Sequence, residues 1–262
     1  MIRLTYLVRA RPGMDRDAFT RYWLEEHGPL VASVAATLKM QRYVQVHTLW
    51  DDEAQAAHEA MSAARGGVEP CYDGVAEVYW SSRDDLLAAL DSPAGQAAAA
   101  MLVEDERVFI DLPNSPLWLG YEYPQVNPTP ETLVASPRGD LVKLYFPLRM
   151  ETSLEAPYAH NYWKHQHGPI IREQAAGSGI LRYIQVHSAR DELDAALQGA
   201  RGTRVPAYDG HAELWFRRSE MGLATPERRA AARRAVEDES RFIDFPRSTL
   251  WLAKEHVFVD RR

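Results

Sequence analysis

The chain has 262 residues, of which 46% are hydrophobic, and its formal net charge is −7. This size allows one or two buried cores, while the acidic balance argues against a nucleic-acid partner, which would need a basic surface. The single cysteine excludes an internal disulfide and a multi-cysteine metal site. The first residues lack the apolar core of a signal peptide, and no run approaches the ~18 apolar residues of a membrane span. We therefore expect a cytoplasmic protein with no membrane partner.

The chain contains two copies of one long pattern. Tyr-Trp-x-x-x-His-Gly-Pro occurs at 22–29 and 162–169, and Arg-Tyr-x-Gln-Val-His occurs at 42–47 and 182–187. Tyr-Asp-Gly-x-Ala-Glu and Leu-Trp-Leu follow in the same order in both halves. A period of more than 130 residues is a whole domain rather than a solenoid repeat. We predict modules at 1–123 and 140–262, joined by a linker at 124–139 that contains Pro124, Pro128, Pro130 and Pro137.

In chain order, the first module begins with an apolar strand at 4–8. A helix follows, with Asp15 as its N-cap and an apolar stripe that includes Phe19 and Trp23. Gly28 is placed to end this helix in a left-handed turn, after which helix resumes over 30–38. Strands are expected at 42–47, 75–80 and 117–123. The Ala-rich stretch 51–67 is a helix or a lid, and residues 84–111 form a helix interrupted near Pro93. This order, β-α-β-β-α-β, is the ferredoxin-like arrangement.

Alternation along the strands assigns the two faces of each predicted sheet. Leu4, Tyr6 and Val8 are expected to face the helices, as are Val44 and Val46. Tyr43, Gln45, His47 and Glu77 then share the opposite, polar face, which needs a partner. The second copy supplies one. We predict an α+β fold of two ferredoxin-like (βαββαβ) modules that pack sheet to sheet as an intramolecular pseudo-dimeric α/β barrel.

These residues resemble the EthD family of the dimeric α/β barrel superfamily. The Tyr-Trp-x-x-x-His-Gly-Pro phrase, the strand ending in Gln-Val-His and the Tyr-Asp-Gly-x-Ala-Glu phrase carry the resemblance, which covers both halves apart from the linker. It implies a ferredoxin-like barrel, a small cavity between sheet and helices, and oxidative or dehydrative work on small organic molecules. The family includes polyketide dehydratases. A tandem fusion departs from its usual single-domain form.

The candidate catalytic residues are histidines and carboxylates that recur in both copies. An imidazole can take and return a proton near neutral pH, so the histidine of the His-Gly-Pro phrase is a candidate acid or base; stabilisation of a helix end is its structural alternative. A strand histidine paired with a glutamate on the same face is a second candidate, and a polar contact between the sheets is the alternative. The residues concerned are His27 and His167, His47 and His187, and Glu77 and Glu213.

The candidate substrate-binding residues are hydroxyl, amide and guanidinium groups expected near the same cavity. A tyrosine hydroxyl could donate to a substrate carbonyl, and an arginine could stabilise an enolate or carboxylate, unless it forms a salt bridge between the sheets. They are Tyr22, Tyr162, Arg9, Arg149, Tyr43, Tyr183, Gln45 and Gln185. Trp23 and Trp163 are expected to anchor the core, and the Glu-Asp-Glu runs at 104–106 and 237–239 to form a solvated helix face plus structural contacts.

No cofactor is predicted. The sequence has no HxH, HExxH or CxxC spacing and no GxGxxG after a strand, so no metal ligands are assigned. Haem, or a metal bound by His and Glu, remains the alternative. His211, Lys254 and His256 occur only in the second copy, whose cavity is therefore expected to be the more polar.

These observations favour a cofactor-independent enzyme that uses histidine acid/base chemistry on a hydrophobic, oxygenated aromatic or polyketide-like compound. Oxygenation, dehydration and isomerisation are all open, so the class is a monooxygenase-like oxidoreductase or a dehydratase-like lyase. The alternative is a non-catalytic ligand-binding or stress-response barrel. A barrel filled by paired polar groups would favour that alternative, whereas a cavity of ~300 Å³ or more with convergent polar atoms would favour the enzyme. Homodimerisation stays open.

Overall fold

The computed structural model describes residues 1–129 and 133–261. The strands of the first module are β1 (Ile2–Val8), β2 (Arg42–Thr48), β3 (Gly74–Trp80) and β4 (Leu117–Val126). Those of the second are β5 (Leu141–Leu148), β6 (Arg182–Ser188), β7 (Gly210–Arg217) and β8 (Trp251–Asp260). Within the described residues no single helix is long and apolar enough to cross a membrane, although the helices Arg83–Asp91 and Pro93–Phe109, bent by 91° relative to each other, meet that test of length and composition as a pair.

The helices of the first module are α1 (Arg16–Tyr22), a π-helical turn (Trp23–His27), α2 (Gly28–Val34), α3 (Asp52–Ala63), α4 (Arg83–Asp91) and α5 (Pro93–Phe109). Those of the second are α6 (Ala156–Tyr162), a π-helical turn (Trp163–His167), α7 (Gly168–Ser178), α8 (Leu193–Arg201) and α9 (Pro226–Glu239). Short 3-10 turns occupy Leu112–Asn114, Arg218–Glu220 and Phe245–Arg247. Asp15 caps α1 through the backbone N–H of Ala18, as predicted.

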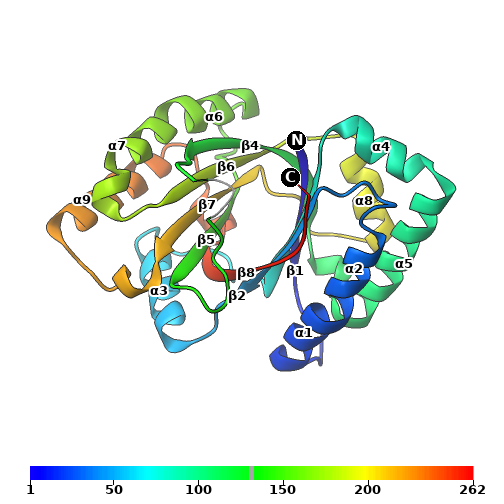
Figure 1. Cartoon of the computed structure of the whole chain (residues 1–262). Helices are drawn as coiled ribbons and strands as arrows, with labels where there is room; N and C mark the ends of the chain where they lie inside the picture. The colour runs from blue at the N-terminus through cyan, green and yellow to red at the C-terminus, as the bar shows by residue number, and fades with distance from the viewer. Residues whose placement is uncertain (130–132, 262) are drawn as a thin grey trace.

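The eight strands form one closed barrel in the order β1-β3-β2-β8-β5-β7-β6-β4, with helices outside it (Figure 1). The last strand of each module crosses to the other module, because β4 pairs with β6 and β8 pairs with β2. The predicted pseudo-dimeric barrel is thereby confirmed, and the closure leaves no free sheet edge. β4 continues to Val126, so its last residues belong to a strand rather than to the linker predicted from 124. Pro130 of that linker lies outside the described residues.

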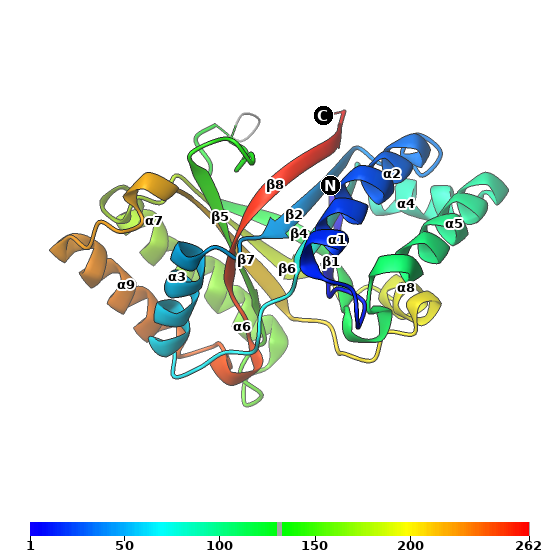
Figure 2. The ribbon, with the colours of Figure 1, turned by 90° about the horizontal axis from the view of Figure 1, so that it is seen from below.

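Two helices are exchanged between the modules. α8 of the second module lies beside α4 and α5 of the first, and α3 of the first lies on the side of α9 (Figures 1 and 2). Leu193 and Leu197 of α8 pack on the first hydrophobic core, whereas Ala54 of α3 is buried in the second. Each exchange is accompanied by an ion pair: Arg201 donates to Glu106 at 2.7 Å, and Arg65 donates to Glu239 at 2.7 Å. The core under each helix layer is therefore completed by the other module.

On β1 the residues that face the helices are the predicted ones, but on β2 they are not. Tyr6 belongs to the core under the helices. On β2 the helix-facing residues are Tyr43, Gln45 and His47, and the valines face into the barrel. Val44 lies directly opposite Glu77 in the β2–β3 ladder, so these two residues share the inner face. Alternation defines two sets of residues on a strand, but here both sets contain large apolar groups, and the wrong set was assigned to the helices.

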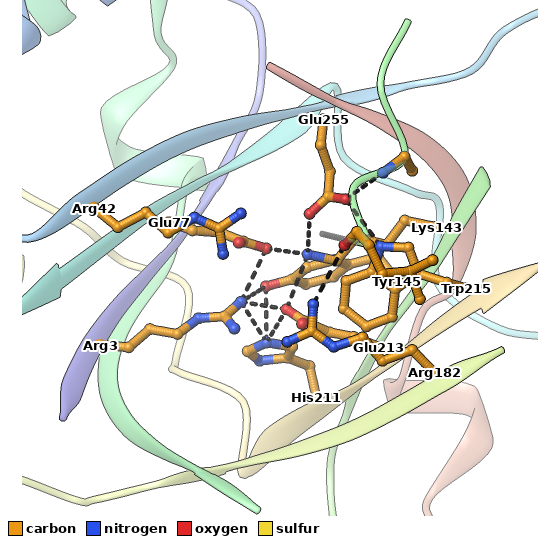
Figure 3. Close-up of polar contacts among 12 residues, drawn as sticks. Arg3, Arg42, Glu77, Lys143, Tyr145, Arg182, His211, Glu213, Trp215 and Glu255 are labelled. Carbon is orange, nitrogen blue, oxygen red and sulfur yellow. Dashed lines mark hydrogen bonds and ion pairs between the residues drawn. The ribbon is translucent and has the colours of Figure 1, made fainter. Parts of the chain in front are cut away.

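Charged side chains from both modules meet inside the barrel (Figure 3), next to apolar residues such as Val44 and Trp118. Arg3 Nη2 contacts Glu77 at 2.9 Å and also pairs with Glu213 of the second module. Lys143 Nζ contacts Glu77 at 2.5 Å, and Glu213 and Glu255 at 3.2 Å each. An eight-stranded barrel is just wide enough for its side chains to fill it. These ion pairs form an ionic core, and they join the two modules inside the barrel.

Burial opposes every charge in this core, and the ion pairs compensate for it. Burial raises the pKa of Glu77 despite its two cations, and the neighbouring carboxylate of Glu213 adds to the rise. Burial acts in the same direction on Glu213, but Arg3 and Lys143 outweigh it and hold the pKa of that carboxyl well below its usual range. Glu213 is therefore an ionised group whose charge depends on cations from both modules.

We expect Glu213→Gln to lower the free energy of unfolding by roughly 3–5 kcal/mol, because Arg3 and Lys143 would remain buried without a full complement of negative charge. Urea unfolding at pH 7 measures this. Glu104→Gln is the control, since its ion pair with Arg107 is exposed, and it is expected to cost less than about 1 kcal/mol. Equal costs for the two variants would contradict a structural role for the ionic core.

Candidate active site

The ligand-sized cavities lie between the outer face of the barrel and the helices, not between the two sheets. The first encloses about 530 Å³ and the second about 190 Å³. Leu4, Tyr6, Ala76 and Val78 form the sheet side of the first, and α8 of the second module closes part of it. This position, between sheet and helices, is the one that the resemblance to the EthD family implied, whereas ion pairs occupy the space between the polar faces, where the pairs of strand histidine and glutamate were expected.

Each histidine of the His-Gly-Pro phrase is the last residue of a π-helical turn and lines the cavity of its own module. Gly28 does not end the helix in a left-handed turn as predicted; its φ of −56° is helical, and the chain continues into α2. Glycine is needed for another reason. A Cβ atom on Gly28 would lie 2.3 Å from the ring of Phe258, and one on Gly168 would lie 2.4 Å from Gln125. The strand that crosses from the other module therefore leaves no room for a Cβ atom, so this position requires glycine.

His27 is held by a carboxylate from a distant helix. Its Nδ1 lies 2.6 Å from Asp105 Oδ2, and Tyr22 Oη donates to Asp105 Oδ1 at 2.8 Å. The second module repeats this arrangement, because His167 Nδ1 lies 2.8 Å from Asp238 Oδ2 and Tyr162 donates to Asp238 at 2.7 Å. Two independent copies of one Tyr–Asp–His geometry indicate a defined arrangement rather than an incidental contact.

The carboxylate determines which nitrogen of His27 is available to a ligand. Burial opposes the ionised form of Asp105, but hydrogen bonds from His27 and Tyr22 outweigh it and lower the pKa of Asp105. An ionised carboxylate only accepts hydrogen bonds, so Nδ1 of His27 carries the proton that it donates. Nε2 is then the ring nitrogen that can act on a ligand, and His27 lines the first cavity. This arrangement orients a candidate general base.

Sequence reasoning did not single out Asp105 and Asp238, because their runs were assigned to a solvated helix face plus structural contacts. The middle acid of each Glu-Asp-Glu run binds the histidine, and the third acid binds the arginine from the exchanged helix region. The signal was the recurrence of an identical acidic triplet in both copies. Recurrence alone did not show that two of its three members turn inward.

His47 and Glu77 do not form the predicted pair, and neither do His187 and Glu213. The glutamates point into the barrel, whereas the histidines lie on the helix side, where His47 stacks on Trp23 at 4.3 Å and His187 stacks on Trp163 at 4.4 Å between ring centroids. Both tryptophans are buried core anchors as predicted. Burial lowers the pKa of His47 to about 3, with His256 adding to the shift. These strand histidines are therefore neutral packing groups at physiological pH.

The remaining predicted binding residues have mostly structural partners. Gln45 Nε2 donates to the Trp23 carbonyl at 2.6 Å and to Tyr43 Oη at 3.0 Å, and Gln185 with Tyr183 repeats this pattern. Tyr43 and Tyr183 also line the two cavities. Arg9 and Arg149 form no salt bridge to the glutamates of the barrel interior; they donate to the Cys71 and Ala207 carbonyls, at 3.1 and 2.7 Å. These arginines fix loops rather than a ligand.

The polar residues unique to the second copy do not make its cavity more polar. His211 lies in the barrel interior, and Lys254 donates to the carbonyls of Gly139 and Leu141. His256 lies beside His47 of the first module, at 4.6 Å between ring centroids, because β8 pairs with β2. Among the described residues, no group of three or more His, Cys, Asp or Glu side chains is arranged to hold a metal ion.

Comparison with known families shows to which family the chain belongs. The EthD domain matches residues 11–113 and 152–246, which contain both His-Gly-Pro phrases and both Glu-Asp-Glu runs. The chain belongs to the EthD family. No functionally curated protein matches this EthD chain.

Solved structures with this overall fold share little sequence with the EthD chain. A provisionally named monooxygenase from Fusobacterium nucleatum subsp. nucleatum superposes with a TM-score of 0.50 at 7% identity, over 98% of this chain and 92% of that one. Another from Lactobacillus acidophilus NCFM gives 0.46 at 7%, covering 99% and 95%. A dye-decolorizing peroxidase from Bacteroides thetaiotaomicron gives 0.47 at 10%, covering 97% and 92%. At such identities the likeness concerns the fold alone.

The depressed pKa of His47 predicts a loss of stability in acid. The unfolded chain binds a proton at this residue below about pH 6.5, whereas the folded chain does not until about pH 3. Acid therefore favours unfolding across this range. We expect His47→Phe, which preserves ring stacking, to reduce the slope of unfolding free energy against pH by about 1.4 kcal/mol per unit between pH 5.5 and 4. Urea titrations at several pH values measure it, and an unchanged slope would contradict the assignment.

Proposed function

We propose that this EthD protein is a small-molecule enzyme in which His27, oriented by Asp105, moves a proton on an apolar, oxygenated compound bound in the first cavity. The single observation that carries the proposal is a histidine bound to a carboxylate through Nδ1 that lines a cavity of about 530 Å³. A cavity of this size suits a compound of two or three rings. The provisional monooxygenase names of the structural neighbours are consistent with such chemistry but do not specify it.

The cavity has the composition that such a ligand needs. Its walls are largely aliphatic and aromatic, formed by residues such as Leu4, Val31 and Trp80, so water is displaced when an apolar compound binds. A base in such surroundings has few competing hydrogen bonds from solvent. The barrel interior, by contrast, holds buried ion pairs rather than an apolar wall of this kind. The ligand-binding alternative shares this cavity and differs only in the absence of proton transfer.

The proposed step is abstraction of a proton from carbon next to a carbonyl, or from a phenol. The C–H or O–H electron pair stays on the substrate as an enolate or phenolate, and the proton moves to Nε2. Return of the proton to another atom completes an isomerisation, and loss of hydroxide, which takes up the proton as water, completes a dehydration. Oxygenation would in addition consume dioxygen as the oxidant. Proton abstraction, isomerisation and dehydration do not require a cofactor, and we propose that none is used.

The proton transfer can be tested without knowledge of the natural substrate. We expect the chain to accelerate exchange of the α-hydrogens of 2-tetralone for deuterium in buffered D₂O, followed by NMR. His27→Gln should slow the enzymatic exchange by roughly 10²-fold or more, the usual contribution of a positioned general base. Asp105→Asn should also slow it, because an amide can stabilise the wrong tautomer of the ring.

His167→Gln is the matched control in the second module. Because the second cavity encloses only about 190 Å³, we expect this variant to retain most of the exchange. Loss of exchange in this variant rather than in the His27 variant would move the chemistry to the second module. Exchange no faster than in buffer, with 2-tetralone shown to bind, would favour the non-catalytic ligand-binding barrel.

A further inference from the structure

A surface depression of about 330 Å³ adjoins the first cavity at the C-terminal end of α5. Arg107, Ile110 and Arg201 line both spaces, and Arg11 lines the depression with them. We call this depression the arginine mouth, after Arg11, Arg107 and Arg201. The side chain of Arg107 is 51% exposed, so it lies at the rim where the cavity meets the mouth. A group at this rim is within reach of a ligand that projects from the cavity.

Two of the three arginines are available to such a ligand. Arg201 is not, because its Nε and Nη2 atoms each donate to the buried carboxylate of Glu106 at 2.7 Å. The ion pair of Arg107 with Glu104, at 3.1 Å, is exposed on both sides, and pairs of this kind are weak enough to be exchanged for a ligand. The side chain of Arg11 is exposed and forms no ion pair with any residue that the structure describes.

The lining of the arginine mouth is predominantly positive. Asp111 is the one acidic residue among the described residues that line it, and its Oδ2 accepts a hydrogen bond from Asn114 at 2.8 Å. The whole chain, by contrast, carries a formal net charge of −7. A local group of arginines at the entrance of a cavity, on a protein that otherwise repels anions, is the place where an anionic ligand is attracted.

The second module lacks these two exposed arginines. Glu151 occupies the position of Arg11, since the backbone N–H groups of the two residues donate to equivalent phenylalanine carbonyls, at 2.9 and 2.7 Å. Ser240 occupies the position of Arg107, directly after the Glu-Asp-Glu run. The buried arginine–glutamate pair, however, is present in both modules and attaches the exchanged segment in each. The exposed arginines are therefore not required by the fold and belong to the larger cavity only.

The contrast between an apolar cavity and a positive rim defines how a ligand can lie. A carboxylate that entered the cavity would lose its hydration without compensation, so it stays at the rim. Apolar rings gain free energy by entering the cavity. A guanidinium group matches the geometry of a carboxylate and can bind both of its oxygens. The two regions together suit a molecule with rings at one end and an acid group at the other.

We propose that the ligand of the first cavity is a ring compound with a carboxylate group, which Arg11 and Arg107 bind at the arginine mouth while the rings lie in the cavity. The inference rests on the proposed function in one respect, because it places the ligand in the first cavity. It adds an acid group to the substrate class and sets the orientation of the ligand. The second module, with Glu151 and Ser240, does not select for that group.

A matched pair of probes tests the inference by binding alone. 2-Naphthylacetate and 2-naphthylacetamide have the same rings and differ in the charge of one group. In equilibrium dialysis near neutral pH and at low salt, we expect the acid to bind roughly tenfold more tightly than the amide. Arg11→Gln and Arg107→Gln should each weaken binding of the acid by roughly three- to tenfold and change binding of the amide by less than about twofold. Added salt should weaken binding of the acid only.

Three control variants locate the effect. Arg247→Gln removes an exposed arginine from the second module, so it lowers the net charge equally, and it should leave binding of both probes unchanged. Ala76→Leu fills space at the sheet wall of the first cavity and should weaken binding of both probes by roughly tenfold or more. Ala212→Leu, the equivalent change in the second module, should not.

Four results would each overturn the inference: no binding of the acid, equal binding of acid and amide, an equal effect of Arg247→Gln, or binding of the acid that survives Ala76→Leu. The proton-exchange experiment is independent, because 2-tetralone has no carboxylate. Absence of exchange with a retained preference for the acid would refute proton transfer by His27 but not the arginine mouth. Loss of that preference with normal exchange would refute the arginine mouth alone.

Discussion

The closure of two sheets around an ionic core is the constraint on which the rest of this protein depends. Arg3 and Lys143 come from the first strand of each module, and each contacts glutamates of both modules. A charge buried without partners is very unfavourable, so neither module can keep this sheet face without the other. Charged side chains occupy the middle of the interior, and the two cavities with His27 and His167 in their walls lie on the opposite face of each sheet, under the helices.

The same exchange between modules completes the two cavities. α8 closes part of the first, and Arg65, which follows α3, reaches the second. Each cavity is therefore made of residues from both copies, although each Tyr–Asp–His arrangement lies within one. Fusion of two copies in one chain allows these two sites to differ, which a dimer of identical chains does not. The difference is visible in their volumes and in the change from Tyr6 to Phe146.

Much of the architecture was predictable from sequence, because it depends on local periodicity and on the duplication. The strand and helix order, the cap at Asp15, the break at Pro93 and the barrel itself all followed from spacing and turn chemistry. The orientation of β2 did not. Its valines and its aromatic and amide residues are both compatible with burial, so alternation could separate the two sets but could not say which faced the helices. The predicted pairing of His47 with Glu77 failed for this reason.

The sequence by itself determined the repeating unit and named His27 as the candidate base, since the histidine recurs in a distinctive phrase. Only the tertiary structure showed its partner, because Asp105 lies 78 residues away on another helix and reaches the ring through packing. The tertiary structure also decided where the ligand space lies. Whether a barrel interior is filled or empty depends on the combined volume and charge of side chains from eight strands, and no local pattern in one strand records that total.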